Sequence, residues 1–387
     1  IVKKDTEKKE PLKVEKMSLA GVGNAAAGAL AIQLATNLFT SEENKPATKK
    51  DLQNFTSMDI DRIKEWFISR DYTVIVSRFS ELDITDNYRG AFIIYQTSEA
   101  PGGFYKRYIE NLVYTLEMQG GVILPSYKYL RAHHDKVFME FLRMGFRDES
   151  LKTIKSKCYG SWVDALNYNG TFPAVIKQTS GSAGKRVFLV YKRNEYERFV
   201  KKAGKTIVAD SIADLLIFNF KNFVKKVIKT LYPSKRNYVK YNTEPLSNAV
   251  IVQNFISGFD GDFRVLFFGG KYYCMHRSNR KNDFRASGSG QFSDVDEKYV
   301  EGLLDFARRL TLEINFPIVG MDIGFDGQNH HLIEYQMLYF GTSALQRASS
   351  WHEYHNGKWV RLTGKSILED EFARSIDMFI NSLSQVN

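Results

Sequence analysis

Two carboxylates, Asp322 and Glu334, lie on the two arms of a predicted hairpin within residues 316–342. An Asp-Gly turn at 326–327 joins the arms, and strand alternation turns Gln336 to the same face as Glu334. A carboxylate in a buried strand costs free energy unless a cation or a hydrogen-bond donor meets it. Two carboxylates and an amide oxygen suit a hard cation such as Mg²⁺. A polar sheet edge facing water would show the same pattern, and spacing alone does not decide between the two.

A second candidate site is a glycine- and serine-rich loop between two predicted strands in residues 172–190. The first strand ends at Lys177, and the loop offers backbone N–H groups and hydroxyls that can close over phosphates. Its members are Ser180, Gly181, Ser182, Gly184 and Lys185. It is not a Walker A loop, because the spacing differs and a strand follows instead of a helix. By itself it is more typical of an ordinary hairpin loop.

A third candidate is a set of arginines around a hairpin that pairs residues 263–268 with 271–275. Arg264 and Arg277 fall on the paired strands, and Arg285 follows beside a second glycine-serine loop. Guanidinium groups that converge near a flexible loop are typical of an anion site. Nucleic acid is an alternative ligand, but no RNP-like or helix-turn-helix pattern accompanies these arginines, so specific nucleic-acid recognition is not expected.

Composition restricts the partners without choosing one. The chain has 387 residues, a formal net charge of +10 and a pI of about 9.2, which favours anionic partners. Its two cysteines, Cys158 and Cys274, form no zinc-type or disulfide-type pattern, which predicts a reducing compartment. No uninterrupted apolar run reaches the length of a membrane span, and no secretory signal is apparent. These features predict a cytoplasmic protein.

Periodicity divides the chain into segments that must position these residues. Residues 1–50 are predicted to form a charged tail, a helix of small residues at 17–39 and a linker. That helix could contact a protein partner or a second copy of the chain, although such helices more often pack on their own chain. Strands and helices alternate over 51–130, which predicts a small parallel α/β domain. A helix is predicted over 130–144, with Lys136 near its start and His133 and His134 at the surface. Further predicted helices cover 194–240, 295–312 and 367–383, the first of them very basic.

The order of these pieces resembles the ATP-grasp superfamily over residues 130–380. The resemblance is carried by an Asp-Lys pair before an apolar helix, a strand with a lysine and a mobile loop, an Asp-x-Arg-Val strand pair, and a metal-binding ending. In the sequence these read HHDKVFMEFLRMGF, PAVIKQTSGSAGKRVFLV, AVIVQNFISGFDGDFRVLFFGGKYYCMHR, NDFRASGSG and VGMDIGFDGQNHHLIEYQ. Within the superfamily the chain most resembles the carboxylate–amine ligases, which include glutathione synthetase and ribosomal-protein glutamate ligases.

The resemblance implies an α/β (α+β) chain with an ATP-grasp fold. Residues 51–130 would form the small α/β domain that precedes it, behind the helical extension of residues 1–50. Residues 131–250 would form the small, lid-bearing subdomain with a basic helical insertion. Residues 251–387 would form the large subdomain with the metal site.

The resemblance also implies roles for residues. ATP phosphates would meet Lys136, Lys177 and the loop of Ser180, Gly181, Ser182, Gly184 and Lys185. The adenine would be lined by Gln253, Asn254, Phe255 and Ile256. The acyl-phosphate intermediate or the carboxylate substrate would be held by Arg264, Arg277 and Arg285. Two Mg²⁺ ions would be bound by Asp322, Glu334 and Gln336.

The implied activity is an ATP-dependent carboxylate–amine ligase that acts through an acyl phosphate and forms an amide or peptide bond. Two departures favour an alternative, a nucleotide-binding module without ligase activity: Asn254 stands where the family has glutamate, and Gln336 where it has asparagine. The acid and amine are not encoded in any motif, although the basic surface suits a peptide or an acidic polymer.

Overall fold

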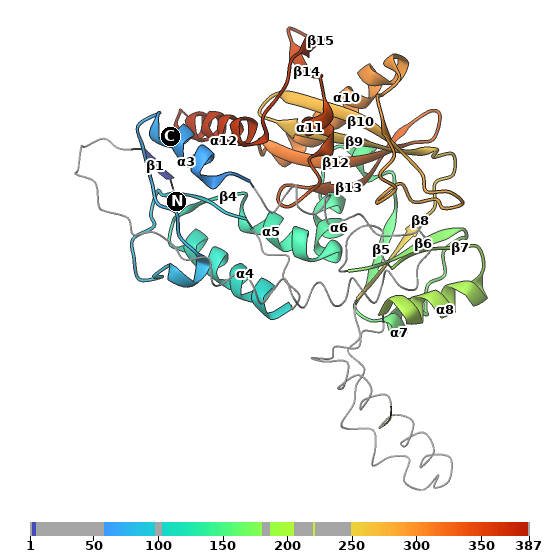
Figure 1. Ribbon diagram of the computed structural model, residues 1–387. Coiled ribbons are helices and arrows are strands. Elements are labelled where there is room, and N and C mark those ends of the chain that lie inside the picture. The colour runs from blue at the N-terminus through green and yellow to red at the C-terminus, as the bar shows by residue number, and fades with distance from the viewer. Residues whose placement is uncertain are drawn as a thin grey trace, which may run out of the picture. The chain divides into compact units, whose positions relative to one another are not determined.

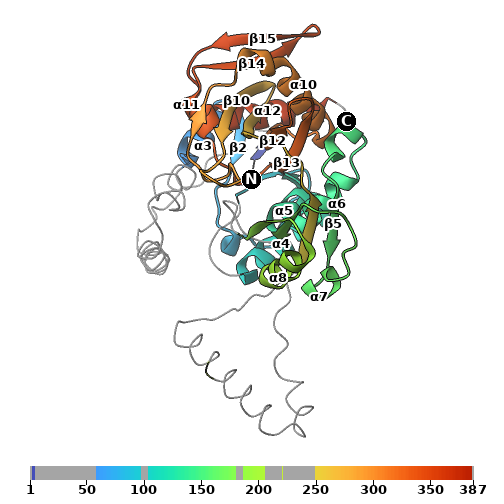
Figure 2. The same cartoon turned by 90° about the vertical axis from the view of Figure 1, so that its right-hand side faces the viewer.

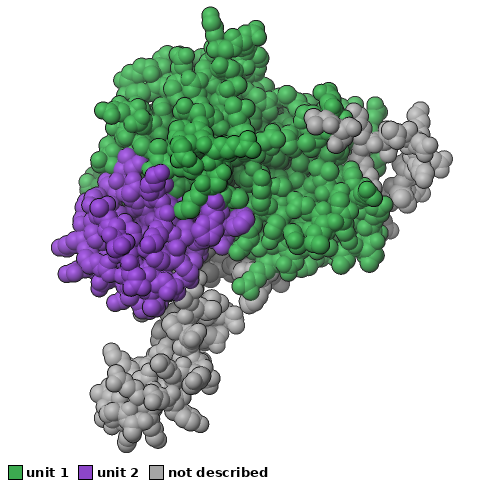
Figure 3. Space-filling model, turned by 180° about the vertical axis from the view of Figure 1, so that it is seen from behind, with its two compact units in different colours: residues 1–134, 142–153, 257–387 green, residues 135–141, 154–256 purple. Residues whose placement is uncertain are grey.

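The computed structural model describes residues 2–4, 58–96, 103–179, 186–204, 220 and 249–385. The chain divides into two compact units, coloured in Figure 3: unit 1 contains residues 1–134, 142–153 and 257–387, and unit 2 contains residues 135–141 and 154–256. Helices and strands are mixed throughout, which confirms the predicted α/β class. The predicted helix at 17–39 and the basic insertion beyond residue 204, apart from residue 220, lie outside the described residues.

The first sheet of unit 1 has the strand order β2-β1-β3-β4. Its strands are β1 (Val2–Lys4), β2 (Tyr72–Val74), β3 (Phe92–Ile94) and β4 (Val122–Leu124). β3 and β4 are parallel, as predicted, but β1 lies between β2 and β3 and is antiparallel to both. The prediction of a wholly parallel domain is therefore wrong, because a segment distant in sequence supplies an inner strand.

Helices complete this part of unit 1. α3 (Ile60–Ile68) begins after Asp59, whose carboxylate accepts a hydrogen bond from the Arg62 N–H and so caps the helix. α4 (Gly103–Met118) buries a stripe at helical spacing against the sheet, and a 3₁₀ turn, η3 (Phe79–Glu81), lies between β2 and β3. The buried stripe of α4 comprises Ile109, Leu112, Val113 and Leu116.

The predicted helix over 130–144 is interrupted. It consists of α5 (Tyr127–His134) and α6 (Lys136–Met144), because Asp135 caps a new helix by accepting from the Val137 N–H. The prediction of two surface histidines is wrong for His134, whose side chain is buried and whose Nδ1 lies 2.6 Å from the Glu110 carboxylate. A 3₁₀ turn, η4 (Glu149–Lys152), follows.

The second sheet of unit 1 holds most of the candidate residues. Its strand order is β13-β12-β9-β10-β14-β15, with β11 also paired to β10. The strands are β9 (Gly261–Phe268), β10 (Lys271–Ser278), β11 (Phe292–Ser293), β12 (Ile318–Phe325), β13 (His330–Gln336), β14 (Ser350–His355) and β15 (Lys358–Thr363). The β9–β10 and β12–β13 hairpins form as predicted, and Figure 2 shows β14 and β15 extending the sheet at its far edge.

Strand alternation gives this sheet two different faces. One face packs on α10 (Glu297–Ile314), which begins at the N-cap Asp296 and lies along the sheet in Figure 1. Contacts of Phe263 with Tyr299 and of Tyr272 with Thr311 fix that packing. The opposite face carries the candidate polar residues, with α11 (Ser343–Arg347) near its middle and α12 (Leu368–Ser384) at the β9–β10 turn.

Unit 2 is built on a four-stranded sheet of order β5-β8-β6-β7. Its strands are β5 (Ser156–Tyr159), β6 (Ala174–Gln178), β7 (Val187–Val190) and β8 (Val250–Asn254), and its helices are α7 (Trp162–Ala165) and α8 (Arg193–Gly204). α8 covers one face through Tyr196, Val200 and Ala203, which pack on apolar residues of the strands. The other face carries Lys177. Among all described helices, none combines the length and the apolar character that a membrane span requires.

Candidate functional site

The β12–β13 hairpin places its two carboxylates directly opposite each other. Asp322 pairs with Glu334 and Gly320 pairs with Gln336, so all three polar side chains share one face of the sheet. The Gln336 amide donates to a Glu334 carboxylate oxygen over 3.2 Å. Asp322 is 7% exposed, so this face is not the wet sheet edge that the sequence left open.

Arginines from β9 and β10 meet Asp322 on the same face. Arg264 donates from Nη1 to Asp322 Oδ1 over 2.6 Å, and Arg277 Nη2 lies 3.0 Å from Asp322 Oδ2. Arg277 also donates from Nε and Nη2 to the two oxygens of Asp262, over 2.8 and 2.6 Å. We name Asp262, Arg264, Arg277, Asp322 and Glu334 the charged row. Within it, Asp262 and Asp322 share the guanidinium group of Arg277, and Asp322 also bonds Arg264.

Burial and mutual charge perturb this row. Burial first, and then the neighbouring Asp322 carboxylate, raise the pKa of Asp262, and the Arg277 guanidinium opposes that rise. Burial lowers the pKa of Arg277, but the carboxylates of Asp322 and Asp262 raise it by more, so this guanidinium stays charged. The pKa of Asp262 is raised although the charged Arg277 lies beside it. Such a shift marks a site where carboxylates are crowded together.

Two glycines of β12 allow aromatic rings to lie against this face. A Cβ at Gly320 would stand 2.8 Å from the Phe340 ring, and a Cβ at Gly324 would stand 2.4 Å from the Phe259 ring. Asp322 lies between these two glycines in β12, with two aromatic rings flanking it. Apolar flanks strengthen electrostatic interactions at the charged row.

The third predicted arginine lies in the loop between β10 and β11. Arg285 donates from Nε to both oxygens of Asp283 at 2.9 Å, and its side chain is 28% exposed. Arg280 braces the loop by bonding the carbonyl of Ser287. Arg285 is therefore held in an ordered loop and is more accessible than the buried Arg277.

The residues present fit a hard divalent cation. Asp322, Glu334 and Gln336 offer oxygen donors on one face of the sheet, which is the donor type that Mg²⁺ prefers. Within the described ranges, no three His, Cys, Asp or Glu side chains gather closely enough to hold a metal without further ligands. A site of this kind suits a cation that also takes ligands from a phosphate.

Unit 2 brings the predicted lysines near one another. Lys177 is the penultimate residue of β6. The backbone N–H of Lys136, at the start of α6, donates to the carbonyl of Thr179 over 3.0 Å. Lys177 shares its sheet face with Gln253 of β8, because Val175 pairs with Gln253 and lies two residues from Lys177. The loop residues Ser180, Gly181, Ser182, Gly184 and Lys185 lie outside the described residues.

The predicted adenine-lining side chains have protein partners of their own. The buried Gln253 amide donates to Glu140 over 3.0 Å and to Ser156 over 2.8 Å. The Asn254 side-chain oxygen accepts from the Lys155 N–H over 2.6 Å, which ties β8 to the start of β5. Phe255 and Ile256 are half-buried at the end of β8. The role of these four residues in binding adenine stays a prediction.

Two residues of this geometry were not predicted as site residues. Asp262 lies two positions before Arg264, so strand alternation alone would have placed it on the same face. Glu140 of α6 reaches Gln253 and Ser156 only through tertiary packing, and no local signal in the sequence indicates it.

Comparison with known proteins finds similarity to solved structures. No family model matches the sequence, and no curated protein does. The structure is similar to several ATP-grasp ligases. A RimK domain ATP-grasp protein from Sphaerobacter thermophilus is 13% identical, with a TM-score of 0.44, and the match covers 75% of this chain and 91% of that one. D-alanine-D-alanine ligase from Helicobacter pylori is 13% identical, with a TM-score of 0.39 and coverages of 71% and 68%.

A third ATP-grasp structure matches over less of its length. L-amino acid ligase from Bacillus licheniformis is 13% identical, with a TM-score of 0.38, over 62% of this chain, and this chain spans 50% of that ligase. Since identity is this low, the activity of the chain has to be argued from the residues of its own site.

Proposed function

We propose that this chain is an ATP-grasp enzyme that uses ATP and Mg²⁺ to join a carboxylate to an amine. The observation that carries the proposal is the charged row, in which Asp322 faces Glu334 across the hairpin and bonds two arginines. Carboxylates for a cation and guanidinium groups for anionic oxygens, on one buried face, suit phosphoryl transfer, which needs positioning and charge neutralisation more than a nucleophilic side chain.

The proposed reaction has two balanced steps. A carboxylate oxygen of the acid attacks the γ-phosphorus of ATP, ADP leaves, and an acyl phosphate forms. The nitrogen of the amine then attacks the acyl carbon, the amide bond forms, and inorganic phosphate leaves while the nitrogen loses a proton. When bound by Asp322, Glu334 and Gln336, Mg²⁺ would neutralise charge on the transferred phosphoryl group.

The residues of the chain supply the remaining positive charge. In unit 2, Lys136 and Lys177 would contact the phosphates of ATP. In unit 1, Arg264 and the more accessible Arg285 would hold the acid and its acyl phosphate. The identities of acid and amine are left open, although the net charge of +10 favours an anionic substrate such as an acidic peptide.

A direct test is ADP formation from ATP and Mg²⁺ with a panel of acids and amines. We expect Glu334→Gln to lower turnover by about 100-fold or more, since it removes one charge that the cation needs. The matched control is Glu301→Gln, the same change at an exposed position of α10, which should leave turnover unchanged. Equal turnover in native protein and Glu334→Gln would refute the metal assignment.

A second candidate function is a nucleotide-binding module that does not ligate. It is favoured by the engagement of both Asp322 oxygens with arginines and of the Asn254 side chain with the backbone of Lys155. Calorimetry with Mg-ATP separates the two functions. Tight binding without ADP release across the substrate panel would favour the module over the ligase.

A further inference from the structure

The turn between β12 and β13 carries a chain of hydrogen bonds that has no part in the proposed reaction. At its centre is His331, whose side chain is 7% exposed. Its Nε2 lies 2.9 Å from an oxygen of Asp326, and its Nδ1 lies 2.8 Å from the hydroxyl of Thr153. The backbone N–H of Asn329, followed by His331, lowers the pKa of Asp326 to about 2, so Asp326 is a carboxylate and Nε2 is the donor. We name Thr153, Asp326 and His331 the His331 cluster.

The His331 cluster lies where the chain crosses from one unit to the other, and all its atoms belong to unit 1. Thr153 is the last residue before the chain enters unit 2 at Ile154. The chain returns to unit 1 at Ser257, and the next residue, Gly258, lies against the backbone of Asp326. A Cβ at Gly258 would stand 3.1 Å from the Asp326 carbonyl oxygen, and the φ of +96° there favours glycine. Both crossings are therefore fastened to the same turn.

Further contacts in unit 1 hold the crossings. The ring of Phe259, just after the return crossing, lies 5.7 Å from the His331 ring between centres and packs against β12 at Gly324. Another crossing also has a buried histidine: His134, the last residue before residue 135 begins a segment of unit 2, pairs with Glu110 over 2.6 Å. The points at which the chain changes unit are thus held by buried contacts.

We propose that His331 is a positioning residue that fastens two crossings to the β12–β13 turn and so restricts the connections between the units. The inference rests on the proposed function, because the lysines for ATP belong to unit 2, whereas Asp322 and Glu334 of the cation site belong to unit 1. A reaction that uses residues of both units has to bring them together, and loose connections raise the entropic cost of that step.

An alternative is that the His331 cluster only stabilises the turn. Asp326 also accepts from the N–H groups of Gln328 and Asn329, so the turn has hydrogen bonds that do not need His331. A role confined to the turn would change the free energy of unfolding and leave kcat of the folded protein as it was. The proposed role lowers kcat and speeds amide exchange at the crossings while the chain stays folded.

The first test uses two changes at Thr153. Thr153→Val keeps the shape of the side chain and removes the hydroxyl, whereas Thr153→Ser keeps the hydroxyl. In assays of ADP formation at saturating ATP and Mg²⁺, we expect Thr153→Val to lower kcat about tenfold and Thr153→Ser to stay within about twofold of native. The matched control is Thr363→Val, the same change at an exposed position of β15, which should leave kcat unchanged. Equal kcat values for native protein and folded Thr153→Val would overturn the proposal.

Hydrogen–deuterium exchange of the full chain, measured by mass spectrometry, tests the same role without turnover. We expect Thr153→Val to speed exchange about tenfold in residues 153–156, with the β9–β10 hairpin unchanged. If Thr153→Val does not fold, Gly258→Ala takes its place, because its methyl group would press on the Asp326 carbonyl and loosen residues 257–260. Native exchange at the loosened crossing would contradict the proposal. Absence of ADP formation by the native chain would instead refute the proposed function, and the exchange test would still decide whether His331 holds the crossings.

Discussion

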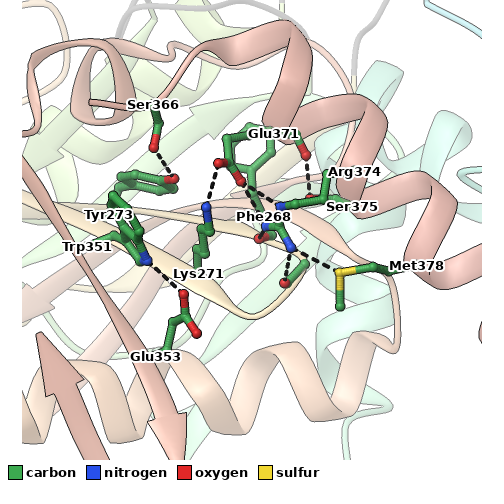
Figure 4. Close-up of polar contacts among 11 residues, drawn as sticks. Phe268, Lys271, Tyr273, Trp351, Glu353, Ser366, Glu371, Arg374, Ser375 and Met378 are labelled. Atoms are coloured by element: carbon green, nitrogen blue, oxygen red, sulfur yellow. Dashed lines mark hydrogen bonds and ion pairs between the residues drawn. The ribbon is translucent and has the colours of Figure 1, made fainter. Parts of the chain in front are cut away.

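Two ion-pair clusters lie on the same face of the second sheet of unit 1, and they differ in how each arginine is shared. The charged row lies beside Gly320 and Gly324, and in it Arg277 is shared by two carboxylates, Asp262 and Asp322. The second cluster, which we name the α12 anchor, comprises Lys271, Trp351, Glu353, Glu371 and Arg374 at the β9–β10 turn (Figure 4). In the anchor, the Glu371 carboxylate meets both cations, Lys271 and Arg374, and the Glu353 carboxylate accepts from the Trp351 indole N–H.

The charged side chains of the α12 anchor are engaged by contacts within the protein. Glu371 receives Lys271 at 2.6 Å on one oxygen and Arg374 at 2.8 Å on the other. Arg374 also donates to the carbonyls of Phe268 and Gly269, and Lys271 lies 4.4 Å from the centre of the Trp351 ring. Such a cluster fixes α12 to the sheet and has little capacity for a ligand.

The comparison shows that residue type alone does not distinguish a candidate functional site from a structural ion-pair cluster. Both clusters use acids, bases and burial on neighbouring stretches of β9 and β10. What separates them is the set of partners that each arginine bonds. Arg277 bonds two carboxylates, Asp262 and Asp322, whereas Arg374 bonds one carboxylate, Glu371, and two backbone carbonyls.

The largest effect on stability is expected from Glu371→Gln. This change leaves Lys271 and Arg374 without their carboxylate and should lower the free energy of unfolding of unit 1 by about 3 kcal/mol. Turnover of the folded protein should remain near native, in contrast to Glu334→Gln. Urea unfolding followed by the turnover assay checks both expectations. If Glu371→Gln kept native stability but lost turnover, the α12 anchor would belong to the functional site.

A smaller effect, visible only in acid, is expected from His330→Phe. Burial, followed by the charges of Arg309 and His331, lowers the pKa of His330 to about 4, and its Nε2 has no hydrogen-bond partner among the described residues. Because the folded pKa lies below the ordinary value of about 6.5, the native protein must lose stability as the pH falls from 6.5 to 4.

The phenylalanine variant should lack this acid loss, because its ring suits a site lined by Phe263, Phe306 and Phe325. Between pH 7 and pH 5 we expect native protein to lose about 2 kcal/mol more than the variant. Unfolding midpoints across that range provide the measurement. Parallel pH profiles for the two proteins would show that His330 does not titrate as expected. Since His330 lies on the α10 face, the change should leave the charged row intact.

The smallest effect is expected from Asp370→Asn, the residue next to Glu371. Asp370 pairs with Arg62 at 2.6 Å, but the two side chains are 34% and 45% exposed. An exposed pair of this kind contributes little, because water solvates both charges when the pair is broken. We expect an unfolding midpoint close to native and far above that of Glu371→Gln. A loss as large as that of Glu371→Gln would show that burial does not explain the strength of the α12 anchor.

Local signals in the sequence were sufficient to predict the two hairpins and the positions of the main candidate residues on them. The Asp-Gly turn and period-two alternation predicted β12 and β13, and the register then placed Asp322 opposite Glu334. Gly269-Gly270 likewise predicted the β9–β10 pairing. The break at Asp135 is also a local signal, an N-cap within an otherwise helical pattern, and it was missed.

Other features depend on residues that are distant in the chain. The strand β1 lies between β2 and β3, and no pattern in residues 2–4 indicates that partner. His134 is buried because Glu110 reaches it from α4, and Gln253 is engaged because Glu140 reaches it from α6.

By itself, the sequence determined which residues carry charge, that the β9–β10 and β12–β13 hairpins form, and which of their side chains share a face, because these follow from period and turn chemistry over a few residues. Only the tertiary structure decided which charged side chains pair. The pairing of β9 with β12 brings Arg264 and Arg277 onto Asp322, and the docking of α12 brings Arg374 and Lys271 onto Glu371. Ion pairing depends on distances of a few ångströms between segments far apart in the chain, and spacing along the sequence does not encode those distances.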